Sequence, residues 1–241
     1  MSTPAATPPT AKRTRRRASR GSGEQLRAEI VAATKDLLAQ AASSDAVSIR
    51  AVADSVGVTS PSIYLHFADK DALIDAVVAD VFAELDAAMI TAGATCESPL
   101  DRLCAYGLAY VQFAIEHPEH YRIATMNHPA GAEHAEAGEI DMVLADSAFN
   151  HLVATVEACM DVQIFAPGDP VPVALELWSA AHGIASLMIA KPFLPWGDKL
   201  QAANNVLRAS ALGHAVNDLM GGQMTPADVD AWLAEERSRR R

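Results

Sequence analysis

Apolar residues recur at helical spacing along most of this chain. The first such pattern starts at Glu24 and consists of apolar residues at three- and four-residue steps: Leu26, Ile30, Ala33, Leu37 and Ala41. Residues at this spacing share one face of a helix. The pattern predicts an amphipathic helix over about 24–41, whereas residues 1–23 carry no hydrophobic period and are expected to form a disordered arm.

Two short helices separated by a glycine turn are expected next. Ser48 is a suitable N-cap for a helix that stops at Gly57, because glycine best tolerates the left-handed conformation that closes a helix. The following helix has Thr59 or Ser60 as its cap and Pro61 in its first turn, where the missing N–H costs nothing. We expect this third helix to run to about Phe67.

The rest of the chain also predicts helices. Leu73, Val77, Val81 and Leu85 share one face of a fourth helix that extends to about Met89. Proline and glycine residues divide the remainder into expected helices near 99–116, 118–127, 138–163, 171–191, 198–220 and 226–237, and no strand pattern is present there. The expected fold class is therefore all-α, with a three-helix N-terminal domain over 24–70 and a larger helical domain over 71–241.

The second and third helices form a helix-turn-helix arrangement, in which the second helix of the pair enters the major groove of DNA. Ser60 and Ser62 offer hydroxyl groups to base edges at the start of that helix, and Pro61 offers an apolar surface to a thymine methyl group. Ser48 and Thr59 are expected to act both as caps and as anchors to the DNA backbone, because free N–H groups at helix starts attract phosphate.

The segment from Val47 to Ile74, VSIRAVADSVGVTSPSIYLHFADKDALI, resembles the DNA-binding signature of the tetracycline-repressor (TetR) family. The resemblance spans about 24–74 and includes a Tyr-x-His-Phe box followed by a lysine. It implies that Tyr64, His66 and Lys70 contact phosphates and that Phe67 packs inside. It also implies that Ser60, Pro61 and Ser62 face bases.

Each of these roles has a structural alternative. The hydroxyl residues would cap helices in any helical protein, Tyr64 would serve as a half-buried core aromatic, and His66 would satisfy a neighbouring carbonyl group. Arg50, early in the second helix, is either a phosphate or guanine contact or a solvated surface arginine. Lys70 favours DNA more strongly, because a cation in the first turn of a helix opposes the helix dipole unless an anion lies close.

The charge is distributed unevenly along the chain, whose net charge is −11. Residues 1–70 carry ten Lys and Arg against six Asp and Glu, whereas residues 71–241 carry nine against twenty-four. Only the N-terminal part is therefore suited to face phosphate. Within it, residues 24–70 hold four basic side chains against six acids, so the six basic residues of the arm are expected to supply much of the attraction to DNA. The alternative is an inert solubilising tail.

The larger domain resembles the WHG type of C-terminal domain found in a subgroup of the family. The resemblance rests on Pro118-Glu-His-Tyr-Arg122 and on Trp178, His182 and Gly183 in a long apolar helix. It implies a homodimer through helices about 171–191 and 198–220. Two faces rich in small and aliphatic residues permit this pairing, and a monomer core would use the same residues. These residues are Ala181, Ile184, Ala185 and Met188 on one helix and Val206, Ala209, Gly213 and Val216 on the other.

A cavity for a small apolar effector is expected among the helices of the larger domain. Its candidate lining consists of aromatic residues, methionines and one histidine: Phe82, Met89, Tyr106, Tyr110, Phe113, Met126, Phe149, Trp178 and His182. The alternative is that these residues are ordinary core. For Trp178 and His182, one turn apart, a structural hydrogen bond from the histidine is the favoured reading.

Other chemistries find little support in the sequence. His117, His120, His128 and His134 match no standard metal-site spacing, so no metal or other cofactor is expected. A redox switch of Cys96 and Cys104 is an alternative to simple packing of Cys104. No phosphate-binding glycine loop, metalloprotease motif or nucleophile elbow is present, so an enzyme is not expected.

The sequence therefore predicts a homodimeric repressor that leaves a palindromic double-stranded DNA operator when a small apolar molecule binds. A helical small-molecule-binding protein or enzyme without sequence-specific DNA binding is the alternative, as is a helical chaperone-like protein. The three cysteines do not suggest a disulfide framework, and neither a secretory signal nor a membrane span is expected. The expected compartment is the cytoplasm.

Overall fold

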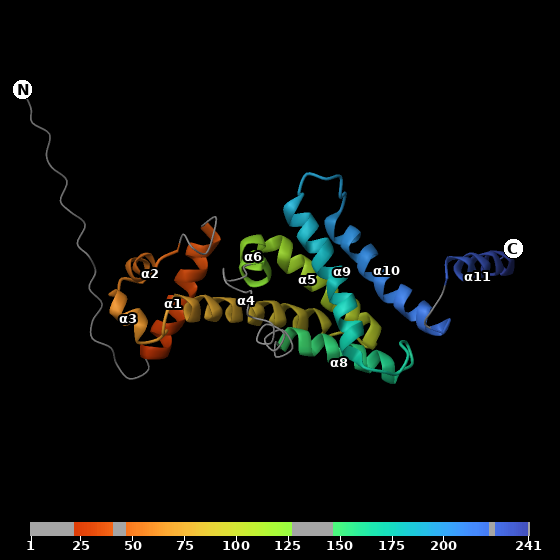
Figure 1. The fold of residues 1–241 in the computed structure, drawn as a ribbon, viewed down its shortest axis with the longest axis horizontal. Helices are drawn as coiled ribbons and strands as arrows, with labels where there is room; N and C mark the ends of the chain where they lie inside the picture. The colour runs from red at the N-terminus through yellow and green to blue at the C-terminus, as the bar shows by residue number, and fades with distance from the viewer. Residues whose placement is uncertain (1–21, 41–46, 127–146, 222–224, 241) are drawn as a thin grey trace, which may run out of the picture. The chain divides into compact units, whose positions relative to one another are not determined.

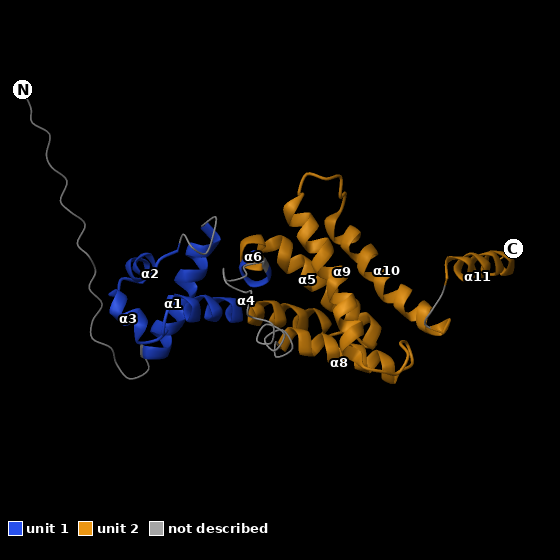
Figure 2. Cartoon of the chain, in the orientation of Figure 1, with its two compact units in different colours: residues 1–80, 122–127 blue, residues 81–121, 128–241 orange. Residues whose placement is uncertain are grey.

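The computed structural model describes residues 22–40, 47–126, 147–221 and 225–240, and every regular element within these ranges is a helix (Figure 1). The all-α expectation is confirmed. The chain divides into two compact units (Figure 2): residues 1–80 with 122–127 form unit 1, and residues 81–121 with 128–241 form unit 2. The expected domain boundary at residue 70 falls inside unit 1, at the first residue of helix α4. The proposed arm over 1–23 lies almost entirely outside the described residues.

Unit 1 is built on α1 (Ser22–Gln40), α2 (Ile49–Val56), α3 (Ser60–Tyr64) and the first half of α4 (Lys70–Gly93). Its core comes from the apolar faces of these helices: Ile30, Val31, Leu38, Val47, Val52, Ala53, Ile63, Phe67, Leu73 and Val77. The observed helix bounds agree with the predicted ones, except that α3 ends at Tyr64 and α4 continues four residues past Met89. One charged residue, Lys35, is also buried, and its ammonium group pairs with the carboxylate of Asp80.

Unit 2 contains the rest of α4 and a set of helices that proline and capping residues start: α5 (Pro99–Glu116), α6 (Pro118–Met126), α8 (Ser147–Asp161), α9 (Pro170–Ala190), α10 (Lys199–Leu219) and α11 (Pro226–Arg239). Ser98, Asp169, Asp198 and Thr225 are the N-caps of α5, α9, α10 and α11, and each side chain accepts a hydrogen bond from a backbone N–H of the first turn. Of the helix predicted over 138–163, the part before Ser147 lies outside the described residues. Helices α4 and α6 each contribute residues to both units.

The core of unit 2 forms where α5, α8, α9 and α10 pack together, and Leu103, Val156, Phe165 and Ala174 lie within it. The α9 face expected to pair with a second subunit is part of this interior. Ala181, Ile184, Ala185 and Met188 are all at most 7% exposed, so the prediction that they form an intersubunit face is wrong. Burial within the subunit is the monomer-core alternative, and it makes this face of α9 unavailable to a second subunit.

Helix α9 is also the one helix, among the described residues, that is long and apolar enough to cross a membrane by length and composition. Its side chains at Val173, Ala174, Leu177 and Ala181 pack in the core of unit 2. A core helix of this kind has the same composition as a membrane span, because both are surrounded by apolar groups. Its packing therefore accounts for its hydropathy.

Candidate functional site

The α2–turn–α3 segment adopts the expected helix-turn-helix geometry. Ser48 has an extended backbone, and its Oγ accepts a hydrogen bond from the Ala51 N–H at 3.2 Å, which caps α2. Gly57 closes α2 with φ 76° and ψ 36°, and the N–H groups of Gly57 and Val58 both donate to the Ala53 carbonyl group at 2.9 Å. A residue with a Cβ is strained at this φ, so glycine fits the turn.

Helix α3 separates its residues into a buried and a solvent-facing set. Ile63 is fully buried, whereas Pro61 is exposed and Ser60 and Ser62 are half-buried at the start of the helix. Thr59 occupies the N-cap position, but its hydroxyl group bonds to the Ser62 hydroxyl group at 2.9 Å and to no backbone N–H. Thr59 is therefore a cap by position only, and the two hydroxyl groups form a pair on the exposed surface.

The residues of the Tyr-x-His-Phe box also differ in how far they are buried. Tyr64 is 53% exposed, so it is not the core aromatic that the structural alternative required. Phe67 is 4% exposed and packs inside as expected, with the guanidinium group of Arg27 lying 5.0 Å from its ring centre. The half-buried ring of His66 forms no hydrogen bond among the described residues, so no neighbouring carbonyl group holds it.

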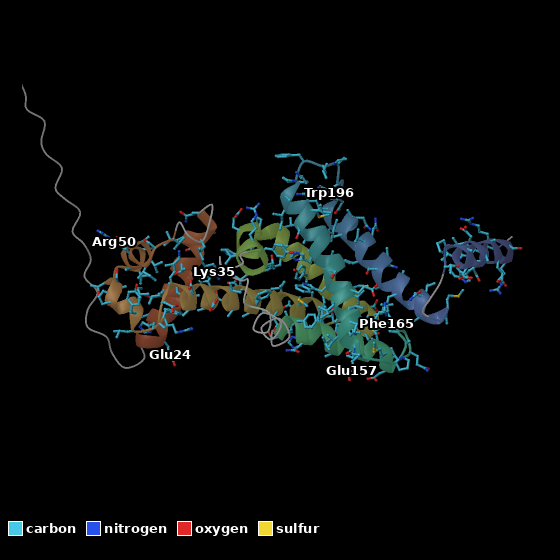
Figure 3. The ribbon with its side chains drawn as sticks, viewed as in Figure 1. Glu24, Lys35, Arg50, Glu157, Phe165 and Trp196 are labelled. Carbon is cyan, nitrogen blue, oxygen red and sulfur yellow. The ribbon has the colours of Figure 1, made fainter. Side chains whose placement is uncertain are left out.

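Fewer of the four cations in residues 24–70 are free to contact DNA than the sequence suggests. Lys35 is buried against Asp80, and Arg27 covers Phe67. Arg50 is exposed and projects from α2 (Figure 3), and Lys70 is half-buried at the first position of α4. Within the described ranges, no carboxylate lies within ion-pair distance of Arg50 or Lys70. These two cations remain available to an external anion.

Sequence analysis missed one exposed side chain beside this surface. Leu65, directly after α3, is 84% exposed and lies within the range to which the third helix was expected to extend. The early end of α3 turns this residue away from the core. Its position between Tyr64 and His66 in the aromatic box was the only available signal.

Three of the expected effector-lining residues instead form a hydrogen-bonded cluster in unit 2. Trp178 Nε1–H donates to the Tyr110 hydroxyl group at 3.2 Å, and that hydroxyl group donates to the Tyr121 hydroxyl group at 3.2 Å. The Tyr121 hydroxyl group lies 2.7 Å from His182 Nδ1. Burial lowers the pKa of His182, and it raises the pKa of Tyr110 well above its ordinary value. A neutral ring that accepts at Nδ1 and neutral tyrosines therefore complete the chain of bonds.

This cluster revises the reading of Trp178 and His182. Their rings lie 5.9 Å apart, and Tyr110 connects them through its hydroxyl group, which bonds to the indole and lies 3.2 Å from His182 Nδ1. The structural hydrogen bond expected of His182 is made with the Tyr121 hydroxyl group, because the Tyr110 hydroxyl group already donates its one proton to Tyr121. Tyr121, which sequence analysis named only within the Pro118–Arg122 motif and not as a lining residue, supplies the shortest of these contacts.

Most other candidates for the effector cavity are packed in the core. Met89, Phe113 and Phe149 are at most 7% exposed and line no described cavity. Phe82 is half-buried, and the side chain of Met126 lies outside the described part of the chain. The dense packing of these side chains is what the ordinary-core alternative expects.

A shallow cavity of about 350 Å³, largely open to solvent, lies elsewhere in unit 2, between the end of α4, the start of α5 and the middle of α8. Of the predicted lining, it includes only Tyr106. Its wall combines small apolar groups with polar side chains: Ile90, Gly93, Ala94, Arg102, Tyr106, His151, Ala154 and Thr155. Its volume falls at the lower end of small-molecule sites, which span about 300–1,000 Å³.

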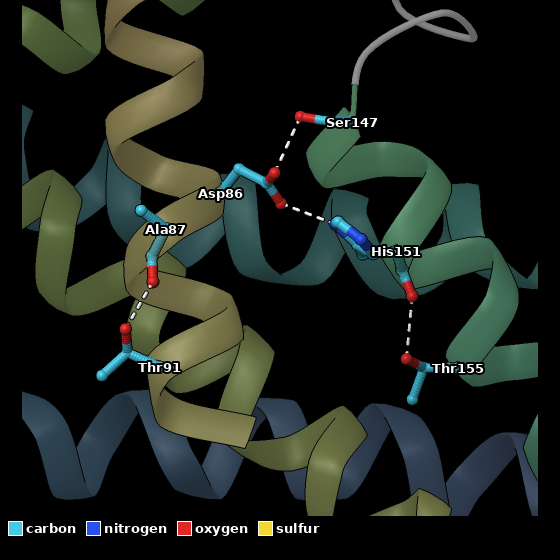
Figure 4. A network of polar contacts seen from close by, with 6 residues as sticks. All are labelled: Asp86, Ala87, Thr91, Ser147, His151 and Thr155. Carbon is cyan, nitrogen blue, oxygen red and sulfur yellow. Dashed lines mark hydrogen bonds and ion pairs between the residues drawn. The ribbon is translucent and has the colours of Figure 1, made fainter. Parts of the chain in front are cut away.

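A polar network adjoins this cavity and links α4 to α8 (Figure 4). The Asp86 carboxylate accepts a hydrogen bond from Ser147 Oγ at 2.8 Å and lies 2.7 Å from His151 Nδ1. Thr155 Oγ1 in turn donates to the His151 carbonyl oxygen at 2.8 Å. Ser147 bonds to the carboxylate rather than to the imidazole, so this trio lacks the nucleophile–base contact of a hydrolase triad.

Metal and redox alternatives gain no support from the geometry. His117 and His120 stack with their ring centres 5.7 Å apart, while His128 and His134 lie outside the described residues. Within the described ranges no three potential ligands gather into a metal site. Burial raises the pKa of Cys104, and it raises that of Cys159 to about 11, which keeps these thiols protonated and poorly nucleophilic near neutral pH.

Comparison with known proteins identifies both parts of the chain. Residues 30–77 match the model for bacterial regulatory proteins of the tetR family, and residues 103–209 match the tetracyclin repressor-like C-terminal domain. The comparison with curated proteins found no match.

Solved structures share the fold along most of the chain. A Rhodococcus sp. RHA1 protein of unknown function is 26% identical, with 79% of this chain and 95% of that chain covered and a TM-score of 0.63. A TetR-like transcriptional regulator from the same organism is 20% identical, with coverages of 85% and 100% and a TM-score of 0.56. A TetR family transcription regulator from Marinobacter aquaeolei VT8 is 15% identical, with coverages of 80% and 98% and a TM-score of 0.61.

The two family matches fall on the two parts that the sequence and the structure separate, the helix-turn-helix segment and the larger helical domain. The observed caps and turn of α2 and α3 provide the geometry for which the N-terminal signature is known. This chain belongs to the tetracycline-repressor (TetR) family of DNA-binding transcriptional regulators.

Proposed function

We propose that the protein is a homodimeric repressor that reads a near-palindromic operator with α3 and leaves it when a small molecule binds to unit 2. One observation carries the DNA part of this proposal. Helix α3 buries Ile63 while it presents Ser60, Pro61, Ser62 and Tyr64 toward solvent. Regulators of this family bind DNA operators as dimers and are generally not enzymes, which favours this function over the catalytic alternative.

The residues proposed to contact DNA differ in the part of DNA that their chemistry suits. Ser60 and Ser62 carry hydroxyl groups suited to base edges, and Pro61 between them is suited to a thymine methyl group. Tyr64, His66 and Lys70 follow along the chain and are suited to phosphate oxygens, which orient the protein without reading sequence. The exposed hydroxyl pair of Thr59 and Ser62 supports a contact in which Thr59 fixes the direction of the Ser62 hydroxyl group.

Backbone anchoring is proposed for Ser48 and Arg50 at the start of α2. The Ser48 cap holds the first turn of α2, where unpaired N–H groups favour an anion. Arg50 is exposed in that same turn and adds a full charge. The arm over residues 1–23 supplies six further cations, which the acidic balance of the rest of the chain makes necessary for DNA binding.

The dimer proposed here uses other faces of α9 and α10 than the one buried within the subunit. On α9, Leu175 and Leu187 are 40% and 52% exposed; on α10, Val206 and Leu212 are 40% and 46% exposed. Ala209 and Gly213 of α10 are exposed between them and permit a close approach of helices. Because regulators of this family act as dimers, we propose that a second copy of the chain covers these apolar side chains.

Release from DNA is proposed to depend on α4. This helix starts beside the helix-turn-helix and ends at the cavity of unit 2, where Ile90 and Gly93 form part of the wall. A molecule bound there affects DNA binding only if it binds the DNA-competent and DNA-incompetent forms unequally. The protein is proposed to act in the cytoplasm, where its DNA target lies.

The first test is selection of bound fragments from random DNA by the full-length protein, repeated across salt concentrations. An inverted-repeat consensus is expected, with each half-site read by one α3. Tyr64→Ala should weaken binding to all sequences by roughly tenfold, because it removes a phosphate contact. Ser62→Ala should change the preferred base at one position of each half-site.

The matched control is Ser238→Ala, which removes an exposed hydroxyl group from α11 and should leave both affinity and consensus unchanged. Sequence-blind binding by the wild type would contradict the operator-reading function. An unchanged consensus and affinity in both α3 variants would contradict the assignment of α3 as the reading helix.

A further inference from the structure

The cavity between α4, α5 and α8 contains one cation that pairs with no acid among the described residues. Arg102 of α5 lines the cavity, and its Nη2 donates to the Cys96 carbonyl oxygen at 3.3 Å. Among the residues that the structure describes, no carboxylate lies within ion-pair distance of its guanidinium group. The adjacent Asp101 accepts from the Ser98 hydroxyl group in the N-cap of α5. The remaining N–H groups of Arg102 are therefore available to a ligand.

The neighbouring helix positions the stem of this arginine. A Cβ placed on Gly93 would lie 3.0 Å from Arg102 Cγ and 2.4 Å from Tyr106 Cε1. Both side chains of α5 thus lie directly against the end of α4, at a place where only glycine leaves room. Contact along the stem restricts the rotamers of Arg102, which lowers the entropy lost when its guanidinium group binds a ligand.

The acid that pairs with His151 of this wall is already satisfied. Asp86 accepts from Ser147 and pairs with His151, so its carboxylate is directed into the α4–α8 network (Figure 4). Because a carboxylate has no proton to donate, His151 Nδ1 carries the hydrogen of this bond. Thr155 Oγ1 donates to the His151 carbonyl oxygen. The ring and the hydroxyl group therefore add polarity to the wall without adding a second uncompensated charge.

The rest of the wall is apolar and lies open to solvent. Ile90 and Ala94 of α4 face the cavity together with Ala154 of α8. A volume of about 350 Å³ holds roughly twelve water-sized groups of about 30 Å³ each. One cation balances one negative charge, and the planar guanidinium group matches the geometry of a carboxylate. A dianionic phosphate group would leave a charge unpaired in this strongly acidic part of the chain.

We propose that this cavity binds a small amphipathic carboxylate, with the carboxylate at Arg102 and the apolar part against Ile90 and Ala154. The proposal revises the expectation of a purely apolar effector. Its consequence for regulation rests on the proposed function, whereas the binding itself does not.

The binding test uses full-length protein in isothermal titration calorimetry with octanoate and 4-phenylbutyrate, each compared with the alcohol of the same skeleton. At least one carboxylate should bind about tenfold or more tightly than its alcohol. Arg102→Gln should weaken carboxylate binding by about tenfold to one-hundredfold and leave alcohol binding unchanged, as expected for a charge-assisted hydrogen bond. Arg102→Lys should recover part of the loss because it keeps the charge.

Two further variants locate the site. Arg239→Gln removes the same charge from the exposed surface of α11 and should bind like the wild type. Ala154→Phe fills the cavity from an exposed position of α8 and should weaken carboxylate and alcohol alike. Absence of carboxylate binding, or equal binding by wild type and Arg102→Gln with a native circular dichroism spectrum, would overturn the proposal.

A DNA-binding assay separates this inference from the proposed function. Fluorescence anisotropy with the selected operator should show that the carboxylate releases wild-type protein and that Arg102→Gln stays bound at the same ligand concentration. Arg102-dependent binding without release would support the carboxylate site and refute its role as the effector site. Operator binding by a protein that takes up neither carboxylate would refute the site and leave the DNA-reading function intact.

Discussion

The buried ion pair of unit 1 gives a prediction whose size follows from the structure. Lys35 of α1 and Asp80 of α4 pair through side chains that are 10% and 44% exposed, respectively. Removing one partner of a fully buried pair costs about 3–5 kcal/mol, because it leaves a charge without compensation in the interior. Water reaches the Asp80 side of this pair and Lys35 keeps its other contacts, so we expect Asp80→Ala to cost about 2 kcal/mol.

The matched control is Asp75→Ala. Asp75 is exposed and lies between one and two turns before Asp80 on the same helix. Both substitutions replace aspartate by alanine in a helix, so the gain in helix propensity cancels. The pKa of Asp75 is raised by desolvation and by the nearby charges of Asp71 and Asp69. A raised carboxyl pKa means that the ionised form is destabilised in the folded protein, so Asp75→Ala is expected to be neutral or slightly stabilising near pH 7.

The assay is thermal unfolding at fixed protein concentration, since dimerisation makes the midpoint depend on concentration. A loss of about 2 kcal/mol in a chain of this size lowers the midpoint by about 4–8 °C. Lys35→Met should cost less than about 1 kcal/mol, because it keeps the apolar stem and removes the buried charge. The double variant Lys35→Met/Asp80→Ala should be close to Lys35→Met. Equal losses for Asp80→Ala and Asp75→Ala would refute this account of the pair.

Three further predictions concern the interfaces and a cap. Deleting residues 1–20 should reduce the slope of log affinity against log salt by about five per subunit, since six cations no longer release counterions. An unchanged slope in a salt titration would show that the arm does not contact DNA. Leu187→Glu should shift the dimer toward monomer in analytical ultracentrifugation, whereas Val162→Glu, equally exposed outside α9 and α10, should not. Ser48→Ala should lower the free energy of unfolding by about 1 kcal/mol through the lost cap of α2, with Ser238→Ala as the hydroxyl control.

The helix-turn-helix could be predicted closely because its signals are local. Ser48, Gly57 and Pro61 determine the backbone at single positions, and the structure places all three as a cap, a left-handed turn and a first-turn proline. The bonding of Thr59 could not be predicted in this way. Its hydroxyl group has two partners within reach, a backbone N–H and the Ser62 hydroxyl group, and sequence spacing does not distinguish them.

Long-range partners were the main source of error. Lys35 was counted among the cations available to DNA, but its partner Asp80 lies 45 residues further along the chain. The apolar face of α9 that includes Ile184 has the composition of both a core and an interface, and only the packing of α5, α8 and α10 around it decides between them. Most aromatic residues expected to line the cavity pack in the core instead. Hydrophobicity indicates that a side chain is buried, but it does not indicate whether empty space lies beside it.

In unit 2, the pairing of polar groups distinguishes a structural cluster from a candidate binding site. A buried polar group is stable when it is fully bonded, as in the chain from Trp178 through Tyr110 and Tyr121 to His182, which the low pKa of that histidine keeps uncharged. Arg102 lies on the same helix as Tyr110, and among the described residues no carboxylate lies within ion-pair distance of its guanidinium group. This half-buried group keeps N–H donors that a bound carboxylate would pair with, which is why a ligand is expected at Arg102 and not at the fully bonded cluster.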